Sequence, residues 1–333
     1  MPEAITFRLA SKADEADIVR FVNEHWNSRH PLVNLRDFFV YYYDAGDGSL
    51  RFALAFNGQR LVAVAGFVPA SQGPQADIWV SLWAADKSAR GAGLELMAAL
   101  PQLTGCRTLA CNNIRPETRA FYEFLGYTTG RAGHFYRLAK RQEYKAASLQ
   151  TQDIPPVNGE AALTLCPTPH ALLARGFTPP PNANPYKDLW YILRRYYEYP
   201  RQQYNVYTAC LPGEATPQAL LATRTVPVLG THVLRIADYI GEASFLPQLG
   251  NAIDGLLLQE DAEYAELYCA GLSSSLLRQA GFAERMEGDS NILPHYLTPP
   301  LIENVDFYYF TSRPDGFVLF RADGDQDRPH TPV

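Results

Sequence analysis

The chain has 333 residues, of which 47% are hydrophobic and 19% charged, and its formal net charge is -6. This length exceeds what one hydrophobic core usually organises, so we expect two domains. The acidic balance argues against nucleic acid as the main partner, because affinity for a phosphate backbone comes from Lys and Arg. The apolar stretches are short and interrupted, which excludes a membrane span of about 20 apolar residues. Because the start also lacks a secretion signal, we expect a cytoplasmic protein.

The first 140 residues predict an α/β pattern with mixed strand pairing. Apolar residues at three- and four-residue spacing predict two helices between residues 15 and 43, broken at 27–31. The pair Asn57-Gly58 stands between two apolar runs and is the strongest short hairpin signal. The elements expected from this hairpin onward are strands at 52–56, 61–68 and 76–84, a glycine-rich turn, a helix at 94–103, a strand at 107–111, a helix at 118–125 and a strand at 134–138.

Residues 141–185 are rich in proline and poor in periodicity, so they predict a linker or an arm on the surface. A second series with the same order then follows. Its expected elements are a helix at 186–197, strands at 204–209, 219–228 and 232–240, a helix at 245–258, a strand at 265–269 and a helix at 273–280.

An internal duplication would explain this repeated order. Both series contain a helix that ends in an apolar residue, a glycine and an aromatic residue, around Gly126 and around Gly281. A helix that ends at a glycine is also common by chance. We therefore predict a domain at 1–140, a linker at 141–185 and a degenerate copy of the first domain at 186–333.

The segment 79–93 reads as a strand followed by a glycine-rich turn that opens a helix. Such a turn directs free backbone N–H groups at one spot, and the helix dipole adds partial positive charge there. A pyrophosphate fits this environment. The sequence Arg90-Gly91-Ala92-Gly93 is a weak signal by itself, because glycines before a helix also allow tight packing.

About thirty residues further on stands the segment 118–127, TRAFYEFLGY. The two segments at this separation resemble the two signature motifs of the GNAT superfamily of N-acetyltransferases. The family pattern Arg/Gln-x-x-Gly-x-Gly/Ala falls on residues 88–93, and Ser88 departs from it. The resemblance implies two tandem GNAT-like domains, of mixed α/β class, that transfer an acyl group from acetyl-CoA or a related acyl-CoA.

The resemblance also implies roles for individual residues. The strand before the turn would pair with the pantetheine arm, and Tyr122 would protonate the departing thiolate, although a core aromatic residue is the alternative for Tyr122. The second half lacks a glycine loop and has Leu277 in place of this tyrosine, so it is not expected to bind CoA. The cofactor-binding residues implied by the resemblance are Ser81, Leu82, Trp83, Ser88, Arg90, Gly91, Ala92, Gly93 and Asn113.

A second resemblance spans most of the chain. The segments 21–31, 78–83, 235–241 and 322–329 are similar to tandem-GNAT proteins associated with bacterial surface-polysaccharide gene clusters. This implies that the acceptor is a small molecule, an amino sugar that is either free or carried on a nucleotide. The expected acceptor-binding residues are His25, Asn27, Arg235, Asp238, His295, Asp323, Asp325, Asp327 and Arg328, and His30 is the first candidate for the general base.

The acidic run that begins at Asp323 invites a calcium interpretation. An EF-hand loop needs Gly at its sixth position and Glu at its twelfth, but Arg328 occupies the sixth and the chain ends before the twelfth. No metal site is therefore expected.

Two other functions remain open at this point. A tandem-GNAT transferase that takes an aminoacyl group from charged tRNA is one, although the acidic balance and the glycine turn count against it. The other is a non-catalytic binding protein whose cofactor site has decayed, which Ser88 suggests.

Overall fold

The computed structural model describes residues 4–329. The extreme ends of the two expected domains, residues 1–3 and 330–333, lie outside this description. The strands are β1 (Ile5–Ser11), β2 (Ser49–Asn57), β3 (Arg60–Pro69), β4 (Ile78–Ala85), β5 (Leu109–Ile114), β6 (Thr128–Leu138), β7 (Ala162–Leu165), β8 (Asn205–Cys210), β9 (Ala219–Val228), β10 (Thr231–Gly241), β11 (Ala262–Ala270), β12 (Ala283–Arg285), β13 (Phe307–Thr311) and β14 (Leu319–Phe320).

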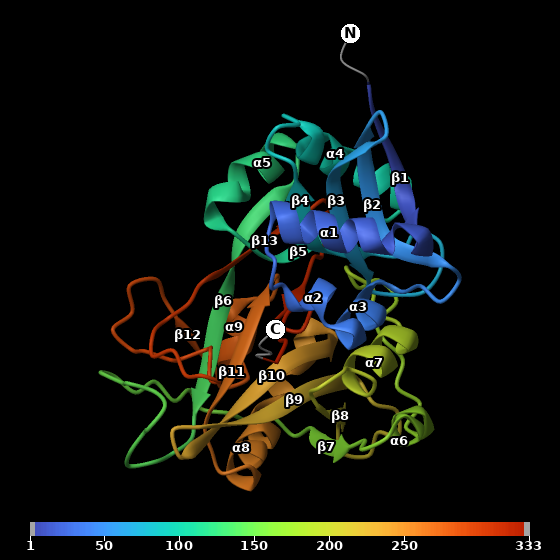
Figure 1. The fold of residues 1–333 in the computed structure, drawn as a ribbon. Helices are drawn as coiled ribbons and strands as arrows, with labels where there is room; N and C mark the ends of the chain where they lie inside the picture. Colours follow the sequence, from blue (N-terminus) through green and yellow to red (C-terminus); the bar gives the residue numbers. More distant parts are fainter. Residues whose placement is uncertain (1–3, 330–333) are drawn as a thin grey trace.

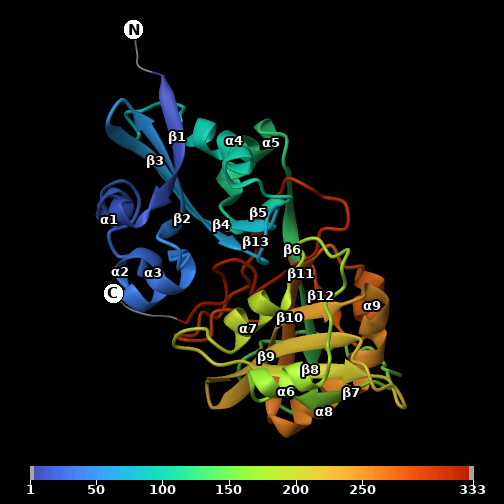
Figure 2. The same ribbon diagram turned by 90° about the vertical axis from the view of Figure 1, so that its right-hand side faces the viewer.

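Helices lie on both faces of the sheet that these strands form (Figures 1 and 2). The α-helices are α1 (Glu15–His25), α2 (Pro31–Asn34), α3 (Arg36–Tyr43), α4 (Ala92–Thr104), α5 (Arg119–Phe124), α6 (Pro169–Ala174), α7 (Leu189–Tyr196), α8 (Gly250–Gln259) and α9 (Ser274–Gln279). Short 3-10 helices are η1 (Lys12–Asp14), η2 (Pro116–Thr118) and η3 (Ala243–Leu249).

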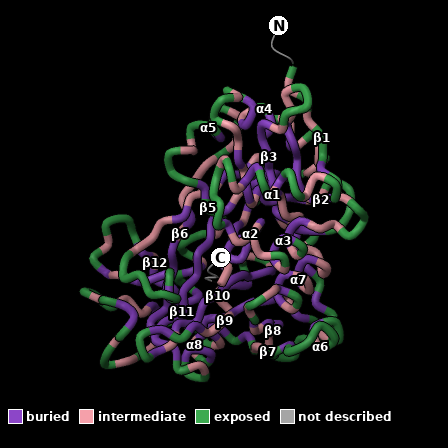
Figure 3. The backbone as a smooth tube through the Cα atoms, in the orientation of Figure 1, coloured by how far each residue is buried: buried purple, intermediate pink, exposed green. Residues whose placement is uncertain are grey.

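The strands pair in the order β1-β2-β3-β4-β5-β13-β6-β11-β10-β9-β8-β7, with β12 and β14 attached to β6 and β11. Most neighbours are antiparallel, but β4 pairs with β5, and β10 with β11, in parallel. This mixture confirms the predicted fold class. Buried residues follow the strands in both halves of the molecule (Figure 3). Among the described residues, no helix is long and apolar enough to cross a membrane.

The first half is built as its local sequence predicts. Asn57 pairs with Arg60, so the hairpin of β2 and β3 turns at Gly58, whose φ of 61° is the left-handed value that glycine adopts readily. Helices α1 to α3 cover one face of its sheet, and α4 and α5 cover the other (Figure 2). The stretch 15–43 forms three helices rather than the two expected, because Pro31 starts the short α2 after the loop.

The second half repeats the order of the first. In both, an antiparallel hairpin leads to a strand, a helix, a parallel strand and another helix: β2-β3-β4-α4-β5-α5 and β8-β9-β10-α8-β11-α9. This repeat agrees with the interpretation as a duplication. The proline-rich stretch 141–185 carries two further elements, since β7 extends the sheet beside β8 and α6 follows it.

Two strands tie the halves together. The long β6 pairs with β13 along 128–132 and with β11 along 133–138. The strand β13, from near the C-terminus, lies between β5 and β6 of the first half. The two parts of the chain therefore share one continuous sheet, which runs from top to bottom in Figure 1.

The space between β10 and β11 is closed by the chain itself. These strands pair only up to Ile236 and Leu267, and then diverge. Strand β14 enters this opening, where it pairs with Cys269 and Ala270 of β11, and the Ala322 N–H donates to Ala237 O at 2.9 Å. A segment of the protein thus occupies the place between the second pair of parallel strands.

Candidate active site

An opening between β4 and β5 is the central feature of the site. The two strands pair only at Ile78 with Leu109 and at Trp79 with Ala110. From Val80 to Ala85, no strand among the described residues pairs with the β5 side of β4. This edge carries Ser81, Leu82 and Trp83, the residues expected to pair with a pantetheine arm. An extended ligand with amide groups matches such an unpaired strand edge.

The glycine turn lies at the end of β4 and opens α4. Gly91 has a φ of 87°, which favours glycine, and it is exposed together with Ser88 and Arg90. A Cβ at Gly93 would lie 2.9 Å from the Ala85 Cβ, so this glycine allows α4 to approach β4 closely. The buried Ala92 begins the helix. The turn thus presents exposed backbone at a helix N-terminus beside the open strand edge.

Tyr122 lies on the same face of the sheet as α4. It is 5% exposed, and its ring stacks on Phe310 with centroids 4.2 Å apart and faces Trp83 at 5.8 Å. Burial raises the pKa of Tyr122, so its hydroxyl stays protonated across the working pH range. The residue therefore combines a packing role with the protonation state that a general acid requires.

The C-terminal tail, residues 321–328, crosses the opposite side of the opening. A Cβ on Gly324 would lie 3.1 Å from the Trp79 Cβ, and Asn112 donates to the Asp323 carbonyl at 3.2 Å. Asn113, expected to bind the cofactor, instead donates to Gln326 Oε1 at 3.3 Å. The tail therefore forms the wall of the site that faces away from α4.

The three tail carboxylates lie in different environments. Asp323 is 2.6 Å from Lys187 Nζ, and Asp327 is 2.7 Å from Arg224 Nη2, so each of these two has a close cation. Asp325 accepts a hydrogen bond from Gln326 at 3.1 Å, and its only ion pair among the described residues is with Arg328 at 3.4 Å. Asp325 thus has the weakest charge compensation of the three.

The charge of Asp325 reaches residues of β5 and of α3 beside the opening. Its charge acts on Cys111 of β5 and on Tyr43, whose hydroxyl hydrogen-bonds Ser81 of β4 at 3.0 Å. Burial raises the pKa of Asp325, and the Arg328 charge offsets this only in part. A buried carboxylate on the tail that crosses the opening is a natural partner for a cationic amine.

The predicted acceptor residues of the second half form a buried network. Arg235 pairs with Glu266 and lies 3.0 Å from Asp327, while Asp238 lies 2.8 Å from Lys187. His295 Nδ1 lies 3.2 Å from Glu266, and its Nε2 accepts from Arg321 at 2.7 Å. These contacts form two clusters, one around Lys187 and one around Arg235, whose charges neutralise one another and hold the tail, so binding of an acceptor by these residues stays a prediction.

The three first-half candidates lie apart from this network. His25 packs on Phe21 with ring centroids 4.4 Å apart, and Asn27 is exposed. Only His30 reaches the tail, where Arg328 Nη1 lies 3.5 Å from its Nε2. Burial and the charge of Arg328 lower the pKa of His30 to about 3, so its imidazole is neutral but weakly basic.

Sequence reasoning missed Lys187, Arg321, Gln326 and Tyr43, which position the tail and the opening. Lys187 is 5% exposed and lies between Asp238 and Asp323. A single lysine at the start of the helix predicted at 186–197 carries no signal of this role, and in the structure it precedes α7, which begins at Leu189. Only its long-range contacts reveal it.

Comparisons with known proteins give a likeness in fold. No protein-family model and no curated protein matches the sequence. Among solved structures, the chain is similar to GCN5-related N-acetyltransferases from Anabaena variabilis and Kribbella flavida, with TM-scores of 0.53 and 0.51 and identities of 11% and 15%. The alignments cover 92% and 93% of this chain and 72% and 71% of those chains.

A protein from Enterococcus faecalis, named a probable N-acyltransferase, is also similar, with a TM-score of 0.54, 10% identity and coverage of 92% and 72%. The chain therefore has the fold of the GCN5-related N-acetyltransferases.

Proposed function

We propose that this protein is an N-acyltransferase that moves an acetyl or related acyl group from acyl-CoA to the amine of an amino sugar, carried on a nucleotide. One observation carries the proposal: β4 and β5 part after two residue pairs, the exposed glycine turn follows β4, and the tail that contains the buried Asp325 contacts Trp79 of β4 and Asn112 of β5. A thioester on one side and an amine on the other would meet there.

Each part of the site would have its own role in the proposed reaction. The turn at 88–93 would hold the pyrophosphate through backbone N–H groups, and the free edge of β4 would align the pantetheine. Asp325 would anchor the ammonium and accept its proton, which leaves the neutral amine to attack the thioester carbonyl. We favour Asp325 over His30 as the base, because a pKa of about 3 makes His30 a poor proton acceptor. Tyr122 would then protonate the departing thiolate.

Acyl transfer itself provides the direct test. The full chain is incubated with acetyl-CoA and a panel of free and nucleotide-linked amino sugars, and products are detected by thiol release and mass spectrometry. We expect acetylation of a sugar amine and no product from the matching N-acetylated sugars. If CoA binds but no amine in the panel is acylated, the amino-sugar assignment is wrong; if CoA does not bind, acyl transfer is excluded.

The glycine turn is tested by Gly91→Val, with Gly105→Val as the matched control. Both glycines flank α4 in left-handed conformations, with φ of 87° and 64°, so both variants carry similar backbone strain. Only the side chain at 91 would stand where the pyrophosphate is expected. We expect calorimetry to show about a 10-fold weaker CoA affinity for Gly91→Val alone, equivalent to one lost charged hydrogen bond. Equal affinities for the two variants would reject the site.

The role of Tyr122 is tested by Tyr122→Phe, which keeps the stacking on Phe310 and removes the hydroxyl. A thiol has a pKa of about 8.5, so the leaving thiolate is a weak base and needs only modest assistance. We therefore expect kcat to fall by roughly 10-fold while CoA affinity is unchanged. A variant with unaltered kcat would show that Tyr122 is a packing residue.

A further inference from the structure

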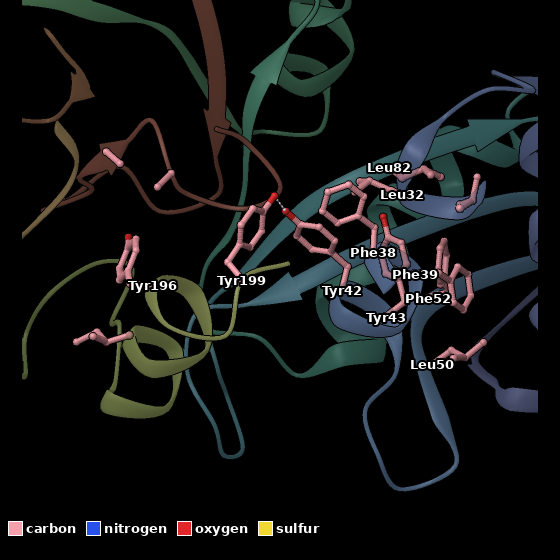
Figure 4. Close-up of a cluster of buried hydrophobic side chains, with 14 of the residues drawn as sticks. Leu32, Phe38, Phe39, Tyr42, Tyr43, Leu50, Phe52, Leu82, Tyr196 and Tyr199 are labelled. Carbon is pink, nitrogen blue, oxygen red and sulfur yellow. Dashed lines mark hydrogen bonds between the residues drawn. The ribbon is translucent and has the colours of Figure 1, made fainter. Parts of the chain in front are cut away.

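We propose that Arg51, Arg194 and Arg195 bind a small anion at the seam between the two halves. Arg51 lies on β2 of the first half, and the other two occupy the last turn of α7. All three line one cavity, together with Trp190 and Gly324. The seam around it is aromatic: Tyr42 and Tyr199 point toward one another and share a hydrogen bond of 2.8 Å (Figure 4).

Arg195 is buried and Arg51 and Arg194 are half-buried, and all three lack the carboxylate partner that an arginine away from solvent normally has. Arg51 donates to the Tyr42 and Asp44 carbonyls at 3.2 and 3.1 Å, and Arg194 donates to a backbone carbonyl as well. None of the three forms an ion pair with a carboxylate within residues 4–329, whereas Arg235 nearby forms two. Burial, and next the charge of Arg194, lower the pKa of Arg51 to about 10. The cluster thus carries positive charge that carbonyl dipoles offset only in part.

Arg195 shows where an anion would bind. Its Nε and Nη2 donate to the carbonyls of Ala322 and Gln326, at 3.0 and 2.7 Å. Arg195 is only 2% exposed, and its Nη1 atom is buried without a hydrogen-bond partner among the described residues. The rings of Tyr199, Tyr204 and Tyr196, with centroids 4.1, 5.1 and 5.9 Å from the guanidinium carbon, supply cation–π contacts but no hydrogen-bond acceptor to Nη1. A buried charged donor without a partner is costly, and an anion would satisfy it.

The volume of the cavity limits what can enter. It is about 10 Å³, which is close to the space that one water molecule requires. One oxygen of a phosphate, whose remainder stays outside, is about as large as a water molecule, whereas the larger chloride ion would enter only if the lining side chains moved apart slightly. Gly324 lines this cavity and directly precedes Asp325. If the phosphate belongs to the acceptor, a step that rests on the proposed function, its amine would lie beside Asp325 while its phosphate meets the arginines.

The test compares thermal unfolding of the full chain, without CoA, in sodium chloride, sodium phosphate and sodium gluconate at equal ionic strength. Gluconate, a bulky organic anion, serves as the reference salt, and the double variant described next corrects for any effect of a salt outside the cavity. We expect chloride or inorganic phosphate to raise Tm by roughly 2–4 °C in a saturable way. The rise should vanish in the double variant Arg51→Gln/Arg194→Gln and persist in Arg278→Gln, whose arginine is exposed and pairs with Asp153.

Each outcome decides the proposal. A response to chloride identifies a free halide, and a response to phosphate alone identifies a phosphate group as the source. Crystals soaked in bromide should then show an anomalous peak beside Arg195 Nη1 in the first case. If Tm is the same in all three salts, or rises equally in the double variant, the cavity holds water only and the proposal is wrong. Because no acyl transfer is measured, a negative result leaves the proposed function untouched.

Discussion

Replacing Asp327 by asparagine is expected to lower the free energy of unfolding by about 3 kcal/mol, because it leaves the half-buried Arg224 without a carboxylate and the buried Arg235 with Glu266 alone. Asp327 is 2% exposed, and its Oδ1 lies 2.7 Å from Arg224 Nη2 and 3.0 Å from Arg235 Nη1. Asparagine has nearly the same shape and tolerates the left-handed φ of 51° at this position. The substitution therefore isolates the charge.

Urea denaturation of Asp327→Asn beside Asp37→Asn measures this effect. Asp37 also pairs with an arginine, Arg201, but the two side chains are 38% and 42% exposed. Exposed pairs of this kind contribute about 0–1 kcal/mol. If the two variants lose the same stability, the buried pairs around Asp327 are not what holds the tail in place.

The stabilisation by Asp327 should depend on pH in a defined direction. Burial alone would raise the pKa of Asp327, but the Arg224 and Arg235 guanidiniums hold it well below its usual value. A carboxyl with a lowered pKa in the folded state stabilises the fold above its unfolded pKa of roughly 3.9 and loses this effect as the pH falls. The difference between wild type and Asp327→Asn should therefore be full at neutral pH and shrink in acid.

The same contacts show why deletion of the tail cannot test catalysis. Arg195 donates to two tail carbonyls, and Lys187 pairs with Asp323. A chain shortened before Asp323 would remove one of the two carbonyls that Arg195 binds, one of the two carboxylates that Lys187 binds and the Asp327 carboxylate, so a loss of stability would mask any effect on the chemistry. Single substitutions that keep the tail in place are the better experiment.

Local signals in the sequence predicted the features that depend on local structure. Asn57-Gly58 predicted the first hairpin, and the glycines at 91 and 93 predicted a turn that opens a helix. The repeated order of elements followed from periodicity alone. These signals succeed because turn conformation and amphipathic spacing are set by residues close together in the chain.

Features built from distant contacts were not predictable in this way. No periodicity indicates that β13 inserts between β5 and β6, or that β14 fills the opening beside β11. The sequence likewise grouped Arg235, Asp238 and the tail acids as one polar site, but only the structure shows that Lys187 and Glu266 neutralise most of that charge. Pairing between buried charges depends on the folded topology.

Asp325→Asn is expected to lower kcat/KM for acyl transfer by about 100-fold while CoA affinity stays unchanged. Asp325 has only the Arg328 contact at 3.4 Å to balance its charge, so an incoming ammonium would be its main partner. Losing one charged hydrogen bond costs up to about 3 kcal/mol, or roughly 100-fold, and the general base is lost with it. Because burial raises the pKa of Asp325, the rate of the wild type should fall as the pH drops through that value, and the variant should lack this acidic limb.

The free energy of unfolding of the Asp325→Asn variant distinguishes a catalytic role of Asp325 from a structural one. A carboxyl whose folded pKa is raised costs stability once the pH rises through that pKa, so the neutral amide of the Asp325→Asn variant should leave the neutral-pH stability unchanged or increase it. This is opposite to the expectation for the paired Asp327, two residues along the same tail. Asp47→Asn, in an exposed loop where Asp47 accepts hydrogen bonds from Ser49, serves as the control for both measurements. A fall in stability comparable to that of Asp327→Asn, or an unchanged rate of transfer, would show that Asp325 only fastens the tail and that the acceptor amine binds elsewhere.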